Sequence, residues 1–189
     1  MNIHPINILE SKKNDKLVFK KSLIEKFSDL LIEIPIIVFI PILCGFALFK
    51  KITTEEPFAG TLILFVLCLT LSGLIIYSIS TLNSLERIKG NSRSQNSKEI
   101  NDIVEKNNWK IYSNNQQMTI INFSWKEAGT DWGKQITILY DQEDILVNCT
   151  SYGLLSTPSP YHWFANRKKV IKLKSEFNNR IKNAPQHRV

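Results

Sequence analysis

Two groups of residues in the second half of the chain have side chains suited to catalysis. Cys149 and His162 are the thiol–imidazole combination that we single out. A cysteine nucleophile needs an imidazole within hydrogen-bond reach and a third group that orients the base. Cys149 lies in an apolar run with no evident orienting partner, so we interpret it as a buried, unreactive thiol. An enzyme that uses Cys149/His162, or the polar loop with Glu127 and Asp131, is the alternative.

Three carboxylates, Asp141, Glu143 and Asp144, fall within one short turn. This turn lacks the glycine and the distal bidentate glutamate of a calcium-binding loop, and we interpret it as a solvated hairpin turn. The remaining metal-binding residue types are widely separated along the chain: His4, His162, His187, Cys44, Cys68 and Cys149. Their spacing matches no zinc pattern, so the sequence predicts neither a metal centre nor a cofactor.

A basic cluster lies within the helix predicted near the end of the chain: Arg167, Lys168, Lys169, Lys172 and Lys174. The first four are candidate contacts with anionic lipid or with a partner, and a solvated helix face is the alternative. Trp125 and Trp132 flank a glycine-containing loop that suits a recognition surface. Because aromatic residues suited to base stacking are not interleaved with the basic ones, we do not expect nucleic-acid binding.

The apolar residues are distributed unevenly along the chain, and this distribution predicts the helices and strands that position the residues above. The chain has 189 residues, 43% hydrophobic and 22% charged, with 24 Lys plus Arg against 17 Asp plus Glu and a net charge of +7. These averages exclude a disordered, collagenous or coiled-coil protein as a whole. Much of the apolar content lies in two blocks before residue 83.

The two blocks predict two membrane-spanning helices over residues 30–49 and 58–82. The first contains one charge, Glu33, near its start, and the second contains none. About 20 apolar residues in a helix cover the roughly 30 Å of a bilayer core. Pro35 and Pro41 predict a bend early in the first span. Residues 50–57 join the spans, so we expect an antiparallel helical hairpin over 30–82.

The charges next to the spans predict their orientation. Six lysines precede the first span and four basic residues follow the second, whereas the connector has only Lys50 and Lys51, offset by Glu55 and Glu56. The positive-inside rule then places both termini in the cytoplasm, and the Ile-, Lys- and Asn-rich composition suits a bacterial inner membrane. The N-terminus does not resemble a cleaved signal peptide.

Residues 1–29 form a basic, amphipathic N-terminal segment. Within it, residues 17–34 have helical spacing, which fits either a helix on the membrane surface or an extension of the first span. Counting from the connector puts Cys44 roughly 9 Å and Cys68 roughly 16 Å below the membrane boundary. That difference in depth predicts that the two thiols do not meet and form no disulfide.

The rest of the chain predicts a linker over 83–97, a cytoplasmic α+β domain over 98–182 and a tail over 183–189. A helix should begin after Ser97 and end near Asn107, because acidic residues fill its first turn. Strands follow at 109–112, 118–125, 135–140 and 145–149, the last two as an antiparallel hairpin. A helix over 163–181 closes the domain. We therefore expect a small antiparallel sheet flanked by two helices in the order α-β-β-β-β-α.

One run of sequence carries a resemblance. Residues 132–153, WGKQITILYDQEDILVNCTSYG, and the helix start at Asn166 to Lys169 resemble a family of uncharacterised bacterial membrane proteins. The resemblance covers about residues 96–180. It implies two N-terminal transmembrane helices and a small C-terminal α+β domain, and it implies no activity.

These observations together favour a membrane-anchored accessory or binding module that is not an enzyme. Its partners would be the lipid bilayer and another membrane or cytoplasmic protein, with the cytoplasmic domain docking onto that protein or onto the anionic lipid surface. The oligomeric state does not follow from the sequence. Transport is disfavoured, because Glu33 is the only ionisable residue in the spans and it lies at an edge.

Overall fold

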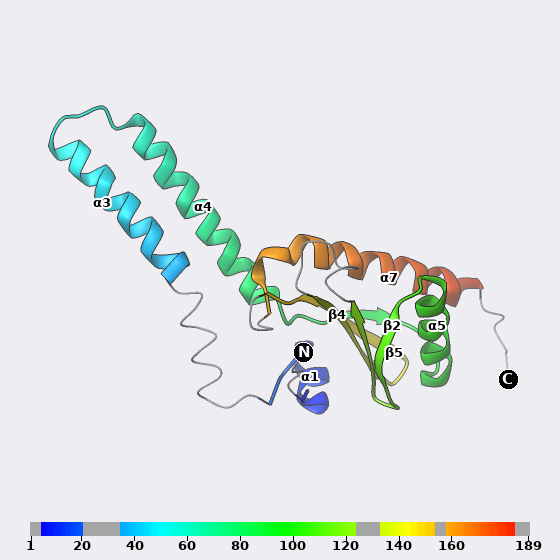
Figure 1. Ribbon diagram of the computed structural model, residues 1–189. Helices are drawn as coiled ribbons and strands as arrows, with labels where there is room; N and C mark the ends of the chain where they lie inside the picture. The colour runs from blue at the N-terminus through cyan, green and yellow to red at the C-terminus, as the bar shows by residue number, and fades with distance from the viewer. Residues whose placement is uncertain (1–4, 21–34, 124–132, 154–157, 184–189) are drawn as a thin grey trace. The chain divides into compact units, whose positions relative to one another are not determined.

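A computed structural model describes residues 5–20, 35–123, 133–153 and 158–183 (Figure 1). The chain divides into two compact units. One consists of residues 21–81, and the other combines residues 1–20 with residues 82–189. The second unit is therefore built from both ends of the chain.

The first unit contains two helices that pack side by side. A π-helical turn, Pro35–Phe39, leads into α3, Ile40–Thr53, and α4 follows as Ala59–Thr81. Pro41 has no backbone N–H to donate to residue 37, which explains why the regular α-helix begins only after a wider turn. The bounds of α4 agree with the expected span over 58–82. Residues 30–34 of the other expected span lie outside the described residues.

The second unit is an α+β domain around one five-stranded antiparallel sheet. The strands are β1 Glu86–Lys89, β2 Lys110–Asn114, β3 Met118–Phe123, β4 Lys134–Asp141 and β5 Asp144–Ser151. Their order across the sheet is β1-β5-β4-β3-β2. The predicted α+β class and four of these strands are confirmed. The β4–β5 hairpin turns at residues 142–143, as its cluster of polar residues indicated.

The structure corrects the expected linker over 83–97. Residues 86–89 form β1, which pairs with β5 from Glu86–Val147 to Lys89–Asp144. Helix α5, Arg93–Lys106, begins after Ser92, five residues earlier than the predicted start after Ser97. Only Ile88 of β1 is buried, so the strand has too little apolar alternation to be recognised without its partner.

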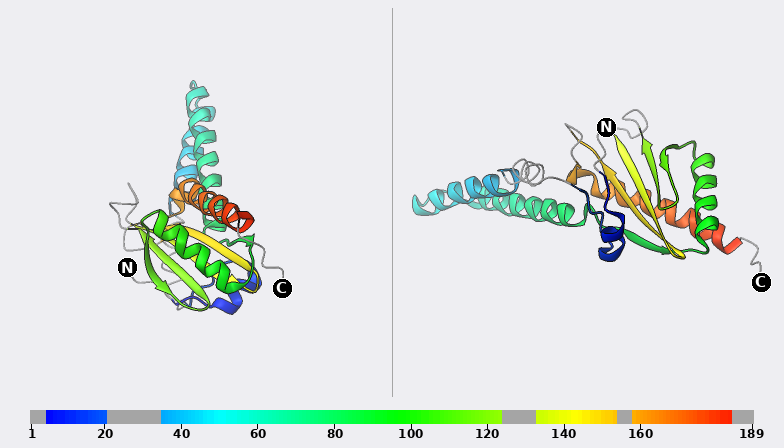
Figure 2. Two further views of the ribbon diagram at one scale, coloured as in Figure 1. Left: turned by 90° about the vertical axis from the view of Figure 1, so that its right-hand side faces the viewer. Right: turned by 90° about the horizontal axis from the view of Figure 1, so that it is seen from below.

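The main core lies between one face of the sheet and two helices. Helix α5 contributes Ile100, Ile103 and Val104, and α7, Trp163–Asn183, contributes Val170, Leu173 and Phe177. Both helices lie on the same face of the sheet (Figure 2). The predicted alternation holds, because Ile136, Ile138 and Tyr140 of β4 face this core while Leu139 belongs to a second cluster.

The second cluster covers the other face of the sheet with residues from the start of the chain. Helix α1, Ile8–Asn14, is followed by Leu17, which is 4% exposed and packs with Leu85, Leu139 and Leu146. Residues 17–20 are not helical, contrary to the expected amphipathic helix over 17–34, and Phe19 instead bridges to Ile6. The described part of the N-terminal segment is therefore a layer of the domain.

Candidate functional site

Residues 21–81 leave and re-enter the same folded domain at neighbouring points. The N–H of Leu17 donates to the carbonyl oxygen of Asn83 at 2.7 Å, and the N–H of Leu85 donates to that of Asp15 at 2.9 Å. The Asn148 side chain fixes the incoming chain, because its Nδ2 donates to the carbonyl oxygens of Leu82 and Ser84 at 2.9 and 2.8 Å. The ends of the segment are thus fastened by backbone pairing and by one buried amide.

The two helices of that segment contact each other along one narrow face. The residues of this helix contact face are at least half-buried and recur at helical spacing: Pro41, Cys44, Gly45 and Leu48 on α3, and Thr61, Phe65, Cys68 and Ser72 on α4. A Cβ added to Gly45 would lie 3.2 Å from the Phe65 ring, so glycine permits this close approach. The small side chains on both helices bring the backbones together.

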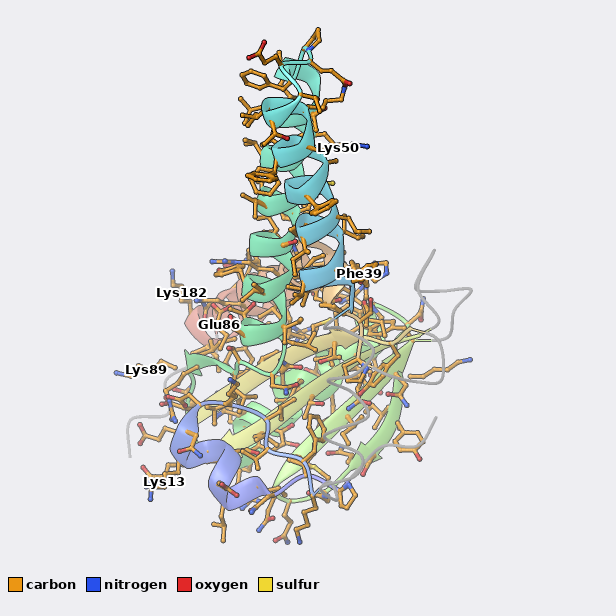
Figure 3. The ribbon with its side chains drawn as sticks, turned by 90° about the vertical axis from the view of Figure 1, so that its left-hand side faces the viewer. Lys13, Phe39, Lys50, Glu86, Lys89 and Lys182 are labelled. Carbon is orange, nitrogen blue, oxygen red and sulfur yellow. The ribbon has the colours of Figure 1, made fainter. Side chains whose placement is uncertain are left out.

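The remaining surface of both helices is apolar and exposed. Between the labelled Phe39 and Lys50, the side chains around α3 are almost entirely carbon (Figure 3). Large exposed side chains surround both helices: Phe39, Ile42, Leu43, Phe46, Phe49, Ile63, Leu64, Val66, Leu67, Leu71 and Ile76. Of the described helices, α4 alone is long and apolar enough to cross a membrane, since α3 has 14 residues.

Cys44 and Cys68 face each other across the helix contact face. Their sulfur atoms are 3.5 Å apart, and both thiols are free. The prediction that the two thiols do not meet was wrong, because the helix ends differ from those assumed. Helix α3 continues to Thr53 instead of ending at residue 49, and α4 begins at Ala59, one residue later than assumed, so each cysteine lies nine residues from the end of its helix at the connector.

Cys149 does not have the exposure that nucleophilic catalysis requires. It is 5% exposed and belongs to the main core between the sheet and α7. Its sulfur lies 3.8 Å from Oδ1 of Asn166, the same oxygen that accepts a hydrogen bond from Ser151 at 2.7 Å. The surroundings of Cys149 therefore match the interpretation as a buried thiol.

Two of the three carboxylates of the β4–β5 turn, Asp141 and Asp144, are paired with a cation of the protein itself. One nitrogen of the Arg87 guanidinium donates to Asp141 at 2.8 Å and to Asp144 at 3.2 Å, and the other nitrogen donates to Asp15 at 2.8 Å. The hydrogen bond with Asp141, then that with Asp15, raises the pKa of Arg87. Arg87 thus supplies the positive charge that a metal ion would bring, and it links α1, β1 and the turn.

The basic cluster of α7 separates into residues with different surroundings. The ammonium group of Lys169 lies over the rings of Phe123 and Trp109, 4.7 and 4.9 Å from their centroids, and burial lowers its pKa. Lys172 donates to Asn107 at 2.8 Å, and Lys174 pairs with Glu86 at 2.5 Å. These three lysines hold α7 against its neighbours.

Arg167 and Lys168 are instead exposed beside large apolar side chains. Tyr161, Phe164 and Ile171 are 57%, 58% and 52% exposed. Tyr161 lies in the 3-10 turn Pro160–His162, which leads directly into α7, and the spacing of 164, 168 and 171 puts these three residues on one side of α7. The ammonium group of Lys168 lies 4.6 Å from the centre of the Phe164 ring. We call Tyr161, Phe164, Lys168 and Ile171 the α7 stripe.

The sequence identified only part of these features. Trp125, Trp132, Glu127 and Asp131 lie outside the described residues. Sequence reasoning missed the Cys44–Cys68 contact, the role of Arg87 and the apolar part of the α7 stripe. The spacing of 161, 164 and 171 was a usable signal for the stripe, whereas the Arg87 contacts depend on β1 pairing with β5.

The chain was compared with protein families, with curated proteins and with solved structures. No protein-family model, no curated protein and no solved structure matches the chain.

Proposed function

We propose that this protein is a membrane-anchored docking module. Residues 30–49 and 58–82 form a transmembrane hairpin in a bacterial inner membrane, and both termini are cytoplasmic. The α+β domain docks onto the anionic lipid surface through the α7 stripe and Arg167. The sequence expectation of an accessory module is retained, with the lipid surface as its partner.

The observation that supports this proposal best is that both ends of residues 21–81 belong to one domain. A folded domain lies on one side of a membrane, so the segment between its two halves crosses an even number of times. If α4 crosses once, a second crossing has to lie between residue 21 and the connector. Helix α3 with the apolar residues before it is the segment that supplies it.

The exposed apolar surface of α3 and α4 supports the same conclusion. Soluble monomers rarely expose contiguous apolar patches above a few hundred Å². Here the apolar side chains surround both helices and leave a contact face of only a few residues on each. Such a surface is stable in lipid, where backbone groups are satisfied within each helix.

The charge distribution supports the cytoplasmic orientation. The connector has two lysines and two glutamates, whereas basic residues are abundant on the domain side of both helices. Cytoplasmic segments next to transmembrane helices carry an excess of Lys and Arg. That orientation places the α7 stripe on the side of the negatively charged leaflet.

The α7 stripe has the chemistry of a helix that lies on a membrane surface. Such helices bury large apolar side chains at the headgroup boundary and keep basic residues beside them. Tyr161, Phe164 and Ile171 supply the apolar contact, and Arg167 and Lys168 supply the charge. Helix α4 ends at Thr81 and the domain resumes at Leu82. Because no linker separates them, the proposed transmembrane helix keeps the domain near the bilayer.

Two measurements on the full chain test the proposal. We expect the protein to stay in the membrane fraction after extraction with alkaline carbonate, which removes peripheral proteins. We also expect an environment-sensitive dye on Ile171→Cys, in a variant without the natural cysteines, to shift to the blue in vesicles that contain anionic lipid. The matched control is Tyr112→Cys, an exposed position on β2.

The outcomes separate the two parts of the proposal. Release by carbonate would contradict the membrane anchor. An equal dye response at the two positions, or no response to anionic lipid, would contradict docking onto lipid. A blue shift at Ile171→Cys that requires an added cytoplasmic extract instead of anionic lipid would replace the lipid surface by a protein partner.

A further inference from the structure

Cys44 and Cys68 bring two thiol groups into contact between α3 and α4. The two thiols are 3.5 Å apart on the face where α3 and α4 meet. A disulfide has an S–S bond of about 2.05 Å, so the two sulfur atoms have to approach each other by only about 1.5 Å for the bond to form. Gly45, next to Cys44, already keeps the backbones close at this depth.

The helix ends support the pairing independently of that distance. Nine residues separate each cysteine from the connector, which is about 14 Å along a helix. With two antiparallel helices, equal counts from a short connector bring the same two positions together. Phe65, one turn before Cys68, packs against Gly45 in the same register. The register of the helix pair therefore brings these two thiols together.

We infer that Cys44 and Cys68 are a modification site, a dithiol that closes to an intrachain disulfide between α3 and α4. The oxidant is a lipid-soluble disulfide. One protein thiol loses its proton and attacks the oxidant, which releases one half of it as a thiol. The second protein thiol then attacks the mixed disulfide and releases the other half as a thiol. Two protein thiols become one disulfide, and one reagent disulfide becomes two thiols.

The solubility of the oxidant follows from the proposed membrane anchor, on which this part of the inference rests. About 14 Å from the helix ends is near the middle of a hydrocarbon core roughly 30 Å thick. A charged reagent does not enter that region. The closure itself rests only on the contact between the two thiols and does not depend on the membrane.

The test uses the full chain in native membranes and two disulfide reagents that differ in charge. The lipid-soluble reagent is 2,2′-dithiodipyridine, and the charged one is 5,5′-dithiobis(2-nitrobenzoate). After treatment, the protein is denatured without reductant, its free thiols are alkylated, and its intact mass is measured. With the lipid-soluble reagent we expect a monomer that has lost two hydrogen atoms and carries no adduct at Cys44 or Cys68.

Three variants show whether the disulfide forms because of the positions of the two cysteines or merely because the helix pair contains two thiols. Cys44→Ser and Cys68→Ser should each retain a pyridylthio adduct at the remaining cysteine, because no neighbour can displace it. The matched control is Cys44→Ser with Leu43→Cys, which keeps two thiols but moves one to an exposed position on α3. This control should also end with adducts instead of a bridge.

Three results would overturn the pairing of Cys44 with Cys68, and a fourth would contradict only its place in the apolar interior. Adducts on both Cys44 and Cys68 of the natural chain, or a bridge in the Leu43→Cys control, would overturn the pairing. A disulfide-linked dimer in place of the bridged monomer would also overturn it. Equally fast closure with the charged reagent would support the dithiol and contradict its place in the apolar interior, and so would count against the proposed anchor alone.

Discussion

The N–H of Leu17 donates to the carbonyl oxygen of Asn83 at 2.7 Å, which joins the two ends of the segment that contains α3 and α4. Leu17 is buried and packs with Leu85 on the face of the sheet opposite α5 and α7. The contact makes the start of the chain part of the C-terminal domain. If the proposed anchor is correct, the segment between these residues crosses the membrane an even number of times, because the domain at its two ends lies on one side.

Replacing Arg87 by Gln should destabilise the domain by about 1 kcal/mol, because three carboxylates lose their common cation. The ion pairs of Arg87 are partly exposed, at 38% for the arginine side chain, so the loss should shrink as salt is added. Urea unfolding of the domain, followed by tryptophan fluorescence, measures the effect.

The matched control for Arg87 is Arg93→Gln. Arg93 is exposed in the first turn of α5, where a positive charge opposes the helix dipole. This change should leave the unfolding midpoint unchanged or raise it slightly. Equal losses for the two variants would show that the Arg87 contacts contribute nothing specific.

Replacing Gly90 by Ala should cost about 1–3 kcal/mol, because the added methyl group has no space. The new Cβ would lie 2.5 Å from Oδ1 of Asn96. That amide cannot retreat, since Oδ1 accepts from the N–H of Asn91 and Nδ2 donates to the carbonyl oxygens of Asn91 and Glu143. Gly60→Ala, where nothing lies within 4 Å of the added Cβ, is the control and should leave the domain midpoint unchanged.

The residues around Gly90 also explain how far the sequence could predict this fold. Strands β3, β4 and β5 and helix α7 have enough apolar residues at period 2 or 3.6 to be recognised locally. Strand β1 and helix α1 do not, because each contributes few buried side chains and depends on partners that are distant in the chain. The buried Asn96 side chain stabilises the β1–α5 turn through its hydrogen bonds with Asn91 and Glu143. In the sequence alone, such polar residues are typical of a linker.

In the candidate site, too, the features that depend on neighbouring residues in the sequence could be predicted, whereas those that depend on tertiary contacts could not. The charge of Arg167 and Lys168 was evident from the sequence, but their separation from Lys169, Lys172 and Lys174 depends on which neighbours α7 packs against. The Cys44–Cys68 contact depended on helix ends that were displaced by only a few residues. Such a displacement is enough to change the partner of a residue across a helix pair.

The domain should lose stability between about pH 10 and pH 12 because of Tyr152. Burial, and secondly the neighbouring Cys149, raises the pKa of Tyr152 from 10.0 to about 12. The unfolded chain therefore releases this proton at lower pH than the folded domain does. The stabilisation is complete below pH 10 and is lost as the pH rises towards 12, by about 2–3 kcal/mol in total.

Tyr152→Phe separates this effect from other alkaline changes. The variant loses the hydrogen bond from the phenol to Gln135, 3.3 Å long, which should cost about 1 kcal/mol at neutral pH. Its unfolding free energy should then fall less steeply above pH 10 than that of the natural chain. Tyr161→Phe changes an exposed tyrosine and should leave the pH profile unchanged. Parallel profiles for all three proteins would contradict the assignment.

Replacing both Arg167 and Lys168 by Gln should weaken docking onto anionic vesicles by about 2 kcal/mol, roughly thirtyfold, because each charge contributes about 1 kcal/mol near such a surface. The dye on Ile171→Cys reports the change. Lys174→Gln removes one charge from the same helix but breaks the pair with Glu86 instead. It should leave docking unchanged and lower the unfolding free energy slightly. A loss of docking by about 1 kcal/mol, half that of the double change, would favour net charge over the α7 stripe.

The most direct test of the account is the accessibility of three engineered cysteines to a charged thiol reagent in spheroplasts. The natural cysteines are replaced, and Leu9→Cys in α1, Glu56→Cys in the connector and Ser175→Cys in α7 are examined one at a time; all three positions are exposed. With a membrane hairpin and both termini in the cytoplasm, the reagent should label Glu56→Cys in intact spheroplasts and label the other two only after the membrane is permeabilised. Labelling of Leu9→Cys and Ser175→Cys from opposite sides would contradict it, because one domain cannot be divided by a membrane.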